Sequence, residues 1–188
     1  MLFRSCGIER AYVHESVFDA FVDGAIGLVK SYVLDDPSKE ETTLGPLVKP
    51  SAARFAREQV SEAVGQGAVA HIDSALFGRD EASSAYMAPQ LLTQVSHKMR
   101  VMTEETFGPV LGIQAVRNDE EAIALMNDSD YGLTAAVFTE DQEAAISIGN
   151  RVNTGTWFMN RCDYLDPALA WTGVKHSGRG CKIGRAHV

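Results

Sequence analysis

The segment MTEETFGPV, residues 102–110, combines chemically useful side chains with a turn. Two carboxylates and an aromatic ring stand directly before a Gly-Pro pair that leads into an apolar run. Ligands of open α/β sheets gather in loops beside strand ends, so this polar and aromatic loop could hold a ligand. The structural alternative is a solvated pair of glutamates and a core phenylalanine that stabilise the turn. The residue types alone favour that alternative.

A cysteine near the beginning of the chain is the second candidate for chemistry. In RSCGIER, residues 4–10, Cys6 is a working nucleophile, the remnant of one, or an ordinary thiol. The cysteines Cys6, Cys162 and Cys181 are far apart, odd in number and without a CxxC pair. The sequence therefore predicts neither a disulfide framework nor a zinc site, and we expect no metal.

The overall charge and hydropathy exclude several classes of partner. The formal charge is −8, and no run of Lys or Arg could follow a phosphate backbone, so we expect no nucleic-acid partner. No apolar stretch approaches the roughly 20 residues of a membrane span. The N-terminus also lacks the charged-then-apolar profile of a signal peptide. The expected location is the cytoplasm.

The elements that must position these residues follow from the apolar pattern. Strands are predicted over residues 10–13, 68–72, 90–95, 110–116, 134–139 and 155–160. Helices are predicted from Ser16 to the Asp35-Asp36-Pro37 stop, from Ser51 to Gly65, and over residues 119–127 and 141–152. Strands that alternate with helices indicate one α/β domain whose mainly parallel sheet is covered by helices on both faces.

Each of the first two helices is expected to bury one apolar stripe. The first stripe comprises Val17, Phe18, Phe21, Val22, Ala25, Ile26, Val29 and Val33. The second comprises Ala52, Phe55, Ala56, Val60, Ala63 and Val64. In the third predicted helix, a cap at Asn118 or Asp119 should precede an inward face of Ala122, Ile123 and Met126.

Four sequence blocks together resemble the aldehyde dehydrogenase superfamily. EETFGPV (104–110) is similar to its E-E-x-F-G-P-V motif, and NDSDYGLTAAVFT (127–139) to its N-x-x-x-Y-G-L-x-x-x-V-F-T block. GTWFMN (155–160) and GVKHSGRG (173–180) follow in the order and spacing of the family. The resemblance covers residues 5–181 and implies a fragment of the family's C-terminal catalytic-domain portion.

The resemblance implies roles for five residues. Glu105 aligns with the glutamate that binds the nicotinamide-ribose hydroxyls of NAD or NADP, and Phe107 with the aromatic residue beside that ribose and the nicotinamide. Asn160 aligns with an asparagine near the active-site floor, although bonding backbone at a strand end is an open structural alternative. Leu165 and Trp171 fall where the family lines its substrate tunnel, which would favour an apolar or aromatic aldehyde.

The same resemblance bears on the cysteine. The family's nucleophile lies in a G-Q-x-C motif, five residues before an arginine that corresponds to Arg10. Ser5 occupies that position, and Cys6 is one place late. The family thiolate attacks the aldehyde to give a thiohemiacetal, hydride leaves to the nicotinamide, and water cleaves the thioester. We therefore expect Cys6 to mark the edge of the active site without being the attacking atom.

The resemblance also implies what lies outside this sequence. Residues 1–4 and 182–188 look foreign to the family and are expected to be non-native ends. The cofactor domain, the general base and the oxyanion-site asparagine of relatives precede the aligned region, so we expect the chain alone to be inactive. The complete parent would be a homo-oligomeric NAD(P)-dependent enzyme that oxidises a small aldehyde to a carboxylic acid. The alternative is a non-catalytic α/β binding or assembly module derived from that family.

Overall fold

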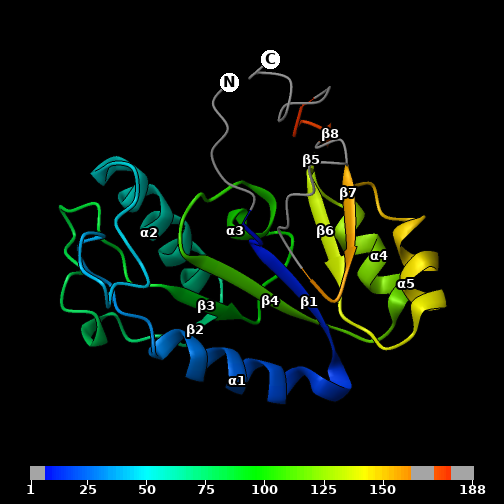
Figure 1. Ribbon diagram of the computed structural model, residues 1–188, viewed down its shortest axis with the longest axis horizontal. Helices are drawn as coiled ribbons and strands as arrows, with labels where there is room; N and C mark the ends of the chain where they lie inside the picture. The colour runs from blue at the N-terminus through cyan, green and yellow to red at the C-terminus, as the bar shows by residue number, and fades with distance from the viewer. Residues whose placement is uncertain (1–6, 162–171, 179–188) are drawn as a thin grey trace. The chain divides into compact units, whose positions relative to one another are not determined.

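The described chain forms two compact units. The structure, a computed structural model of the full chain, describes residues 7–161 and 172–178. One unit is Glu9–Val116; the other begins at Arg117 and includes residues 7 and 8. Figure 1 labels the elements of both. That they belong to a single domain over residues 5–181 stays a prediction.

The Glu9–Val116 unit is built on a four-stranded sheet. Its strand order is β1 (Arg10–His14), β4 (Val110–Val116), β3 (Gln90–Thr93) and β2 (Val69–Ala70). The first three strands are parallel, whereas β2 runs antiparallel to β3. The prediction of a mainly parallel sheet is confirmed for this unit, and β4 has the predicted bounds.

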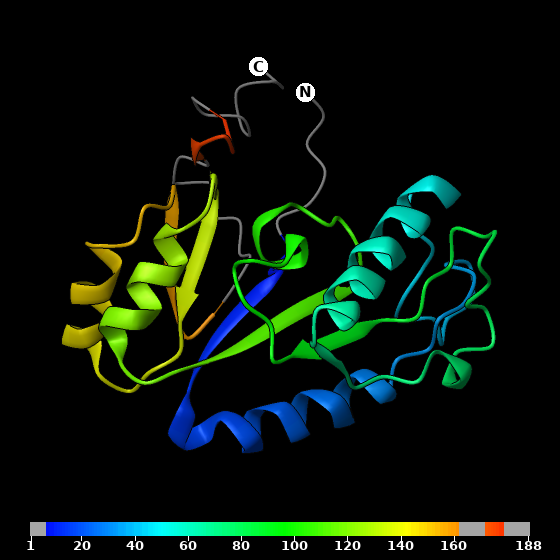
Figure 2. The ribbon, with the colours of Figure 1, turned by 180° about the vertical axis from the view of Figure 1, so that it is seen from behind.

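Helices cover both faces of this sheet, as predicted (Figures 1 and 2). Against one face lies α1 (Phe18–Lys30), and against the other lie α2 (Pro50–Gly65) and the short α3 (Arg100–Thr103). Successive strand residues point to opposite faces. Leu91 accordingly packs in the α1 cluster, whereas Leu92 packs in the α2 cluster. The parallel strands are thus buried on both sides.

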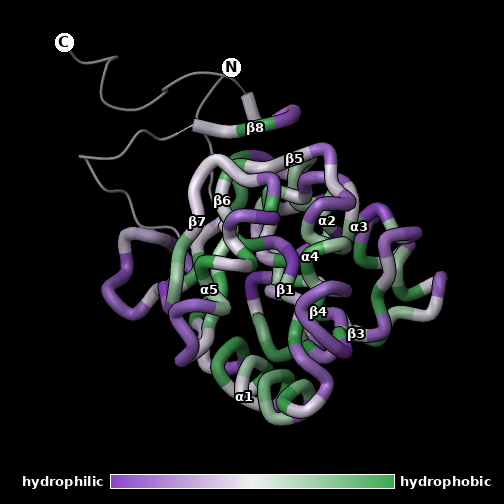
Figure 3. The backbone as a smooth tube through the Cα atoms, turned by 90° about the vertical axis from the view of Figure 1, so that its right-hand side faces the viewer, coloured by the Kyte–Doolittle hydropathy of each residue, from purple (hydrophilic) through white to green (hydrophobic). Residues whose placement is uncertain are grey.

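The predicted start of the first helix is wrong, whereas its predicted buried stripe is correct in part. A 3-10 turn, η1 (Glu15–Val17), precedes α1, and the Ser16 amide donates to His14 Nδ1 instead of Ser16 capping the helix. Five residues of the stripe pack in one core cluster with the sheet: Phe18, Val22, Ala25, Ile26 and Val29. The other three, Val17, Phe21 and Val33, are exposed, Phe21 to 43%. Figure 3 colours much of α1 hydrophobic. Its apolar residues occupy more of the helix surface than the sheet can cover.

The predicted face of the second helix is correct at Ala56 and Ala63, which are buried, but wrong at its edges. The helix begins at Pro50, a residue suited to the first helical position. Its buried residues are Ala53, Ala56, Gln59 and Ala63, not Phe55 or Val64. The small alanines let the helix approach the sheet closely. The ring of Phe55 instead lies 5.5 Å from the Arg100 guanidinium on the outer side.

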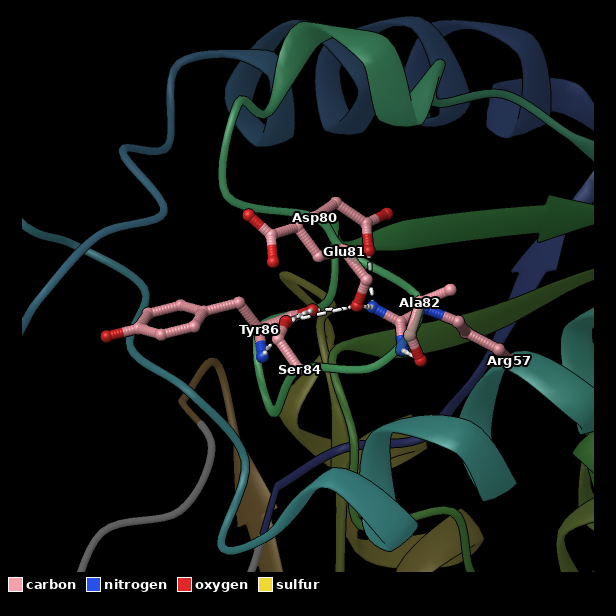
Figure 4. A network of polar contacts seen from close by, with 6 residues as sticks. All are labelled: Arg57, Asp80, Glu81, Ala82, Ser84 and Tyr86. Atoms are coloured by element: carbon pink, nitrogen blue, oxygen red, sulfur yellow. Dashed lines mark hydrogen bonds and ion pairs between the residues drawn. The ribbon is translucent and has the colours of Figure 1, made fainter.

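The same helix ties down the long connection between β2 and β3, which contains the 3-10 turn η2 (Ser74–Leu76). Arg57 binds the Asp80 carboxylate and donates to the carbonyls of Glu81 at 3.0 Å and Tyr86 at 2.5 Å. Its other terminal nitrogen donates to the carbonyl of Ala82 at 3.4 Å. Figure 4 shows this guanidinium at the centre of the loop. One cation therefore orders residues 80–86.

The C-terminal unit contains α4 (Asp119–Asn127) and α5 (Gln142–Gly149), together with two pairs of short strands. β6 (Thr134–Val137) runs parallel to β7 (Thr156–Met159), and β5 (Tyr131–Gly132) runs antiparallel to β8 (Val174–Lys175). The α4 bounds are those predicted, and the Asn118 side chain caps the helix by accepting from the Glu121 amide at 3.0 Å.

Across the described residues, no helix is both long and apolar enough for a membrane crossing.

Candidate functional site

The loop at residues 104–109 carries both predicted cofactor contacts. It leaves α3 at Thr103 and enters β4 at Val110, so it lies at the amino ends of the parallel strands β4 and β3. Open α/β sheets more often bind ligands at the opposite, carboxyl ends, so topology alone does not identify this site. Within the loop, Glu105 is exposed, Phe107 is half-buried and Thr106 is 3% exposed.

The backbone of Phe107 has a left-handed conformation with φ +48°. For a residue with a side chain, this conformation costs about 1–3 kcal/mol. The Glu9 carboxylate stabilises it, because one oxygen accepts the Thr106 amide and the other accepts the Phe107 amide, each at 3.1 Å. A hydrogen bond to a charged group contributes about 1.5–3 kcal/mol. The two bonds together are therefore large enough to offset the strain.

Glu9 is a functional candidate that the sequence did not reveal. It stands next to Arg10, where a strand begins, and a carboxylate there has no local partner to suggest a role. Its backbone carbonyl also accepts the Gly112 amide at 3.1 Å, which joins the start of β1 to β4. Glu9 therefore connects the segment that follows Cys6 in the sequence to the 104–109 loop.

The Gly-Pro turn of the loop is fixed by contacts that a larger residue would disturb. A Cβ at position 108 would lie 3.1 Å from the Ala56 Cβ on α2, a tight contact that glycine avoids. The Gln90 amide donates to the Pro109 carbonyl at 2.7 Å. The loop is thus held by the helix on one side and by β3 on the other.

The other glutamate of the loop has a structural role. Arg100 donates to the Glu104 carboxylate at 3.0 and 3.1 Å and to Glu62 on α2 at 2.9 Å. These hydrogen bonds from Arg100 lower the pKa of Glu104 below its ordinary value. The ion pair joins α3 to α2 directly before Glu105. Glu104 therefore anchors the loop, and Glu105 and Phe107 remain its candidate ligand contacts.

Asn160 makes the bonds of its structural alternative. Its side-chain oxygen accepts the Thr139 amide and its side-chain nitrogen donates to the Thr139 carbonyl, both at 2.9 Å. Its φ of +55° lies in the left-handed region, which asparagine tolerates better than most residues. These bonds hold the segment after β6 against the end of β7. A place in the substrate pocket stays a prediction for this residue.

Two of the family-like blocks, residues 127–139 and 173–180, meet in one hydrogen-bonded junction of the C-terminal unit. Asn127 accepts a backbone amide at residue 153 and donates to a backbone carbonyl at residue 151. Lys175 donates to two carbonyls at the end of α4, where a cation also complements the helix dipole. Ser177 accepts the Gly132 amide at 2.9 Å. These motif residues hold the C-terminal unit together.

Four predicted site residues lie outside the part of the chain that the structure describes: Ser5, Cys6, Leu165 and Trp171. Their predicted roles as nucleophile position and substrate-pocket lining stay predictions. Within residues 7–161 and 172–178, no three His, Cys, Asp or Glu side chains form a group suited to a metal ion.

The curated relatives of the chain include dehydrogenases of the predicted kind. The succinate-semialdehyde dehydrogenase [NADP(+)] of Deinococcus radiodurans is 37% identical over 93% of this chain. The chain spans only 36% of that relative, about a third of its length.

Solved structures agree in fold. The NADP-dependent glyceraldehyde-3-phosphate dehydrogenase of Bacillus halodurans C-125, complexed with NADP, is 33% identical with a TM-score of 0.85, over 95% of this chain and 37% of that one. The betaine aldehyde dehydrogenase of Staphylococcus aureus, in complex with NAD+, is 28% identical with a TM-score of 0.85, over 94% of this chain and 35% of that one. Both neighbours support the predicted α/β fold.

The sequence model described as the aldehyde dehydrogenase family matches residues 4–188. Because this match spans nearly the whole chain, the chain belongs to the aldehyde dehydrogenase family.

Proposed function

We propose that this chain is part of an NAD(P)-dependent aldehyde dehydrogenase that oxidises an aldehyde to a carboxylic acid. Within it, Glu105 and Phe107 contact the nicotinamide half of the dinucleotide. The observation that carries the proposal is the anchored 104–109 loop, which exposes a carboxylate beside a half-buried ring. The relatives' names mention both NAD+ and NADP, so the choice between them stays open.

The loop residues fit the group they would hold. The Glu105 carboxylate has two acceptor oxygens, which suit the two neighbouring hydroxyls of a ribose. The Phe107 ring, fixed by its backbone, offers an apolar side against which a flat ring can rest. When bound, the nicotinamide accepts the hydride that leaves the substrate. The contribution of these residues is to orient it and to limit its movement.

The rest of the proposed active site depends on sequence alignment. Ser5 at the nucleophile position and Cys6 beside it indicate that this chain does not form the covalent intermediate by itself. An unactivated hydroxyl is far less nucleophilic than a thiolate at neutral pH. Leu165, Trp171 and Asn160 would line the aldehyde pocket. The complete protein is proposed to be a cytoplasmic homo-oligomer.

A non-catalytic binding or assembly module is the second candidate. Ser5 at the nucleophile position favours it, and so does Asn160, whose polar side-chain atoms bond the Thr139 backbone. The two candidates differ in one respect that can be measured with this chain. An enzyme fragment keeps a face that binds the nicotinamide nucleotide, whereas an assembly module has no need of one.

The test is a titration of the full 188-residue chain with nicotinamide mononucleotide, followed by amide chemical shifts. We expect saturable shifts at residues 105–107, and an affinity at least about tenfold weaker in Glu105→Gln, which loses a charged hydrogen bond. Glu58→Gln removes a charge from an exposed site on α2 and serves as the control. Absence of saturable shifts in the loop would refute the cofactor role. Sustained NAD(P)H formation by this chain with an aldehyde would refute its inactivity.

A further inference from the structure

We propose that Glu9 is a positioning residue for the nicotinamide nucleotide. Its carboxylate holds the backbone of Thr106 and Phe107 in the conformation that presents Glu105 and Phe107 to the ligand. This inference rests on the proposed function for the ligand, but its structural half stands on the geometry of the Glu9–Val116 unit alone.

The geometry is that of an anion bound by consecutive amides. The Thr106 amide donates to one Glu9 oxygen and the Phe107 amide to the other, both at 3.1 Å. Successive amides that converge on one anion form a nest, and a left-handed residue is a usual part of one. Phe107 supplies that residue with φ +48°. The internal carboxylate of Glu9 therefore occupies the nest, so the nest is not an external anion site.

The bonded amides adjoin the two candidate ligand contacts. Glu105 directly precedes Thr106, and the second bonded amide belongs to Phe107 itself. Thr106 is 3% exposed, so its backbone has little access to water that could replace a lost partner. Without Glu9, Phe107 would gain by returning to a negative φ. That rotation would redirect both its ring and the neighbouring carboxylate.

The backbone of Glu9 is itself held by the sheet. In the sequence Glu9 lies four residues after Ser5 and three after Cys6. Its carbonyl accepts the Gly112 amide, and Arg10 pairs with Gly112 in the β1–β4 register. A strand pair therefore fixes the Glu9 backbone while its side chain fixes the loop. Sites held on rigid elements in this way keep their geometry better than sites on free loops.

A carboxylate offers an acceptor oxygen to each of the two amides, whereas a side-chain amide does not. Glutamine at position 9 keeps the size of the side chain but offers one oxygen, and its NH2 group would face the second amide donor. Glu9→Gln thus keeps one bond, now to a neutral acceptor, and replaces the other with two donors that face each other, with little change in volume. Glu58→Gln makes the same chemical change at an exposed position on α2, which makes it a matched control.

The first arm of the experiment needs no ligand. Hydrogen exchange of the Thr106 and Phe107 amides is measured by NMR in the full 188-residue chain. We expect both amides to be protected in the wild type and to exchange at least about tenfold faster in Glu9→Gln, with no change in Glu58→Gln. Unprotected amides in the wild type would overturn the proposal without any variant, even if Glu9→Gln failed to fold.

The second arm measures binding of nicotinamide mononucleotide and of ribose 5-phosphate, which lacks the ring. For Glu9→Gln we expect the mononucleotide to bind at least about tenfold more weakly than to the wild type, with an affinity close to that of ribose 5-phosphate for the same variant. Equal mononucleotide binding by Glu9→Gln and the wild type would overturn the positioning role. If the wild type does not bind the mononucleotide, the proposed function fails, and the exchange arm alone decides whether Glu9 holds the loop.

Discussion

The contact of Met102 on α3 with Gly112 on β4 gives a quantitative prediction for Gly112→Ala. A Cβ at this position would lie 2.3 Å from the Met102 sulfur and 3.6 Å from its terminal methyl carbon. Met102 is fully buried, so its side chain cannot swing into solvent. Inserting a methyl group into a packed core costs about 1–3 kcal/mol. Methionine adapts more easily than other core residues, so we expect a cost in the lower half of that range.

The assay is urea denaturation of the full chain, arranged as a double-mutant cycle with Met102→Ala. The methionine variant alone should lose about 2–5 kcal/mol of unfolding free energy. In its background Gly112→Ala should cost far less, because the clashing sulfur is gone, and the coupling should be about 1–2 kcal/mol. Gly24→Ala is the control: nothing lies within 4 Å of its Cβ position on α1, so it should stabilise by about 0.5–1 kcal/mol.

The packing argument is refuted if Gly112→Ala lowers the free energy of unfolding equally with and without the methionine sulfur. It is also refuted if Gly112→Ala leaves the stability of the wild-type chain unchanged. Either result would mean that α3 adjusts its distance from β4 freely, so that this contact does not fix the beginning of the 104–109 loop.

Other contacts of the structure lead to three shorter predictions. Asn160→Ala should be about 1–2 kcal/mol less stable in urea than Asn160→Gly, since both lose the Thr139 bonds but alanine also strains the left-handed backbone; equal stability would contradict this. Arg57→Met should lose about 1.5–3 kcal/mol and expose residues 80–86 to proteases; unchanged cleavage would count against it. Because Arg100 lowers the pKa of Glu104, that carboxylate stabilises the fold above its ordinary pKa of 4.5 and loses its contribution as pH falls through the folded-state pKa. The melting temperature of Glu104→Gln should therefore fall less between pH 7 and pH 3 than that of the wild type, and parallel curves would be the opposing result.

Local signals predicted much of the fold. The β4 strand and the α4 helix have the predicted bounds because each is marked within its own sequence: an uninterrupted apolar run for the strand, and the Asn118 cap for the helix. The alternation of such elements was sufficient for the α/β class and for a sheet with helices on both faces. These features depend on neighbours in sequence, so no knowledge of distant contacts is needed.

The limits of the inward faces of the first two helices could not be predicted in the same way. In α1, periodicity predicted the centre of the buried stripe but not its edges, because apolar side chains surround much of the helix. Phe21 is exposed although it was predicted to belong to the stripe and Val22 beside it is buried. In α2, Gln59 is fully buried and Phe55 lies outside, which reverses the choice that hydrophobicity favours. Tertiary packing decides such cases.

The candidate site was predictable only in part. Glu105 and Phe107 were identified by resemblance to a family, and their residue types alone pointed to a structural role. Glu9 was missed because its partners Thr106 and Phe107 lie far along the chain, and no local pattern connects them. The two hydrogen bonds between Asn160 and the Thr139 backbone correspond to one of two predicted alternatives. An asparagine at a strand end suits both a structural role and a place in the substrate pocket.

The order of strands has a consequence for biosynthesis. β4 lies between β1 and β3 and pairs with both, with Arg10 opposite Gly112 and Gln90 opposite Val110. A ribosome therefore releases β1 and α1 long before β4, the strand that joins β1 to β3 in parallel. Connections of this length slow folding, because chain entropy is lost before the pairing compensates for it. During translation the apolar side chains of α1 and β1 are therefore not yet covered by the rest of the core. Chaperones or association with other chains can bind them before β4 is synthesised.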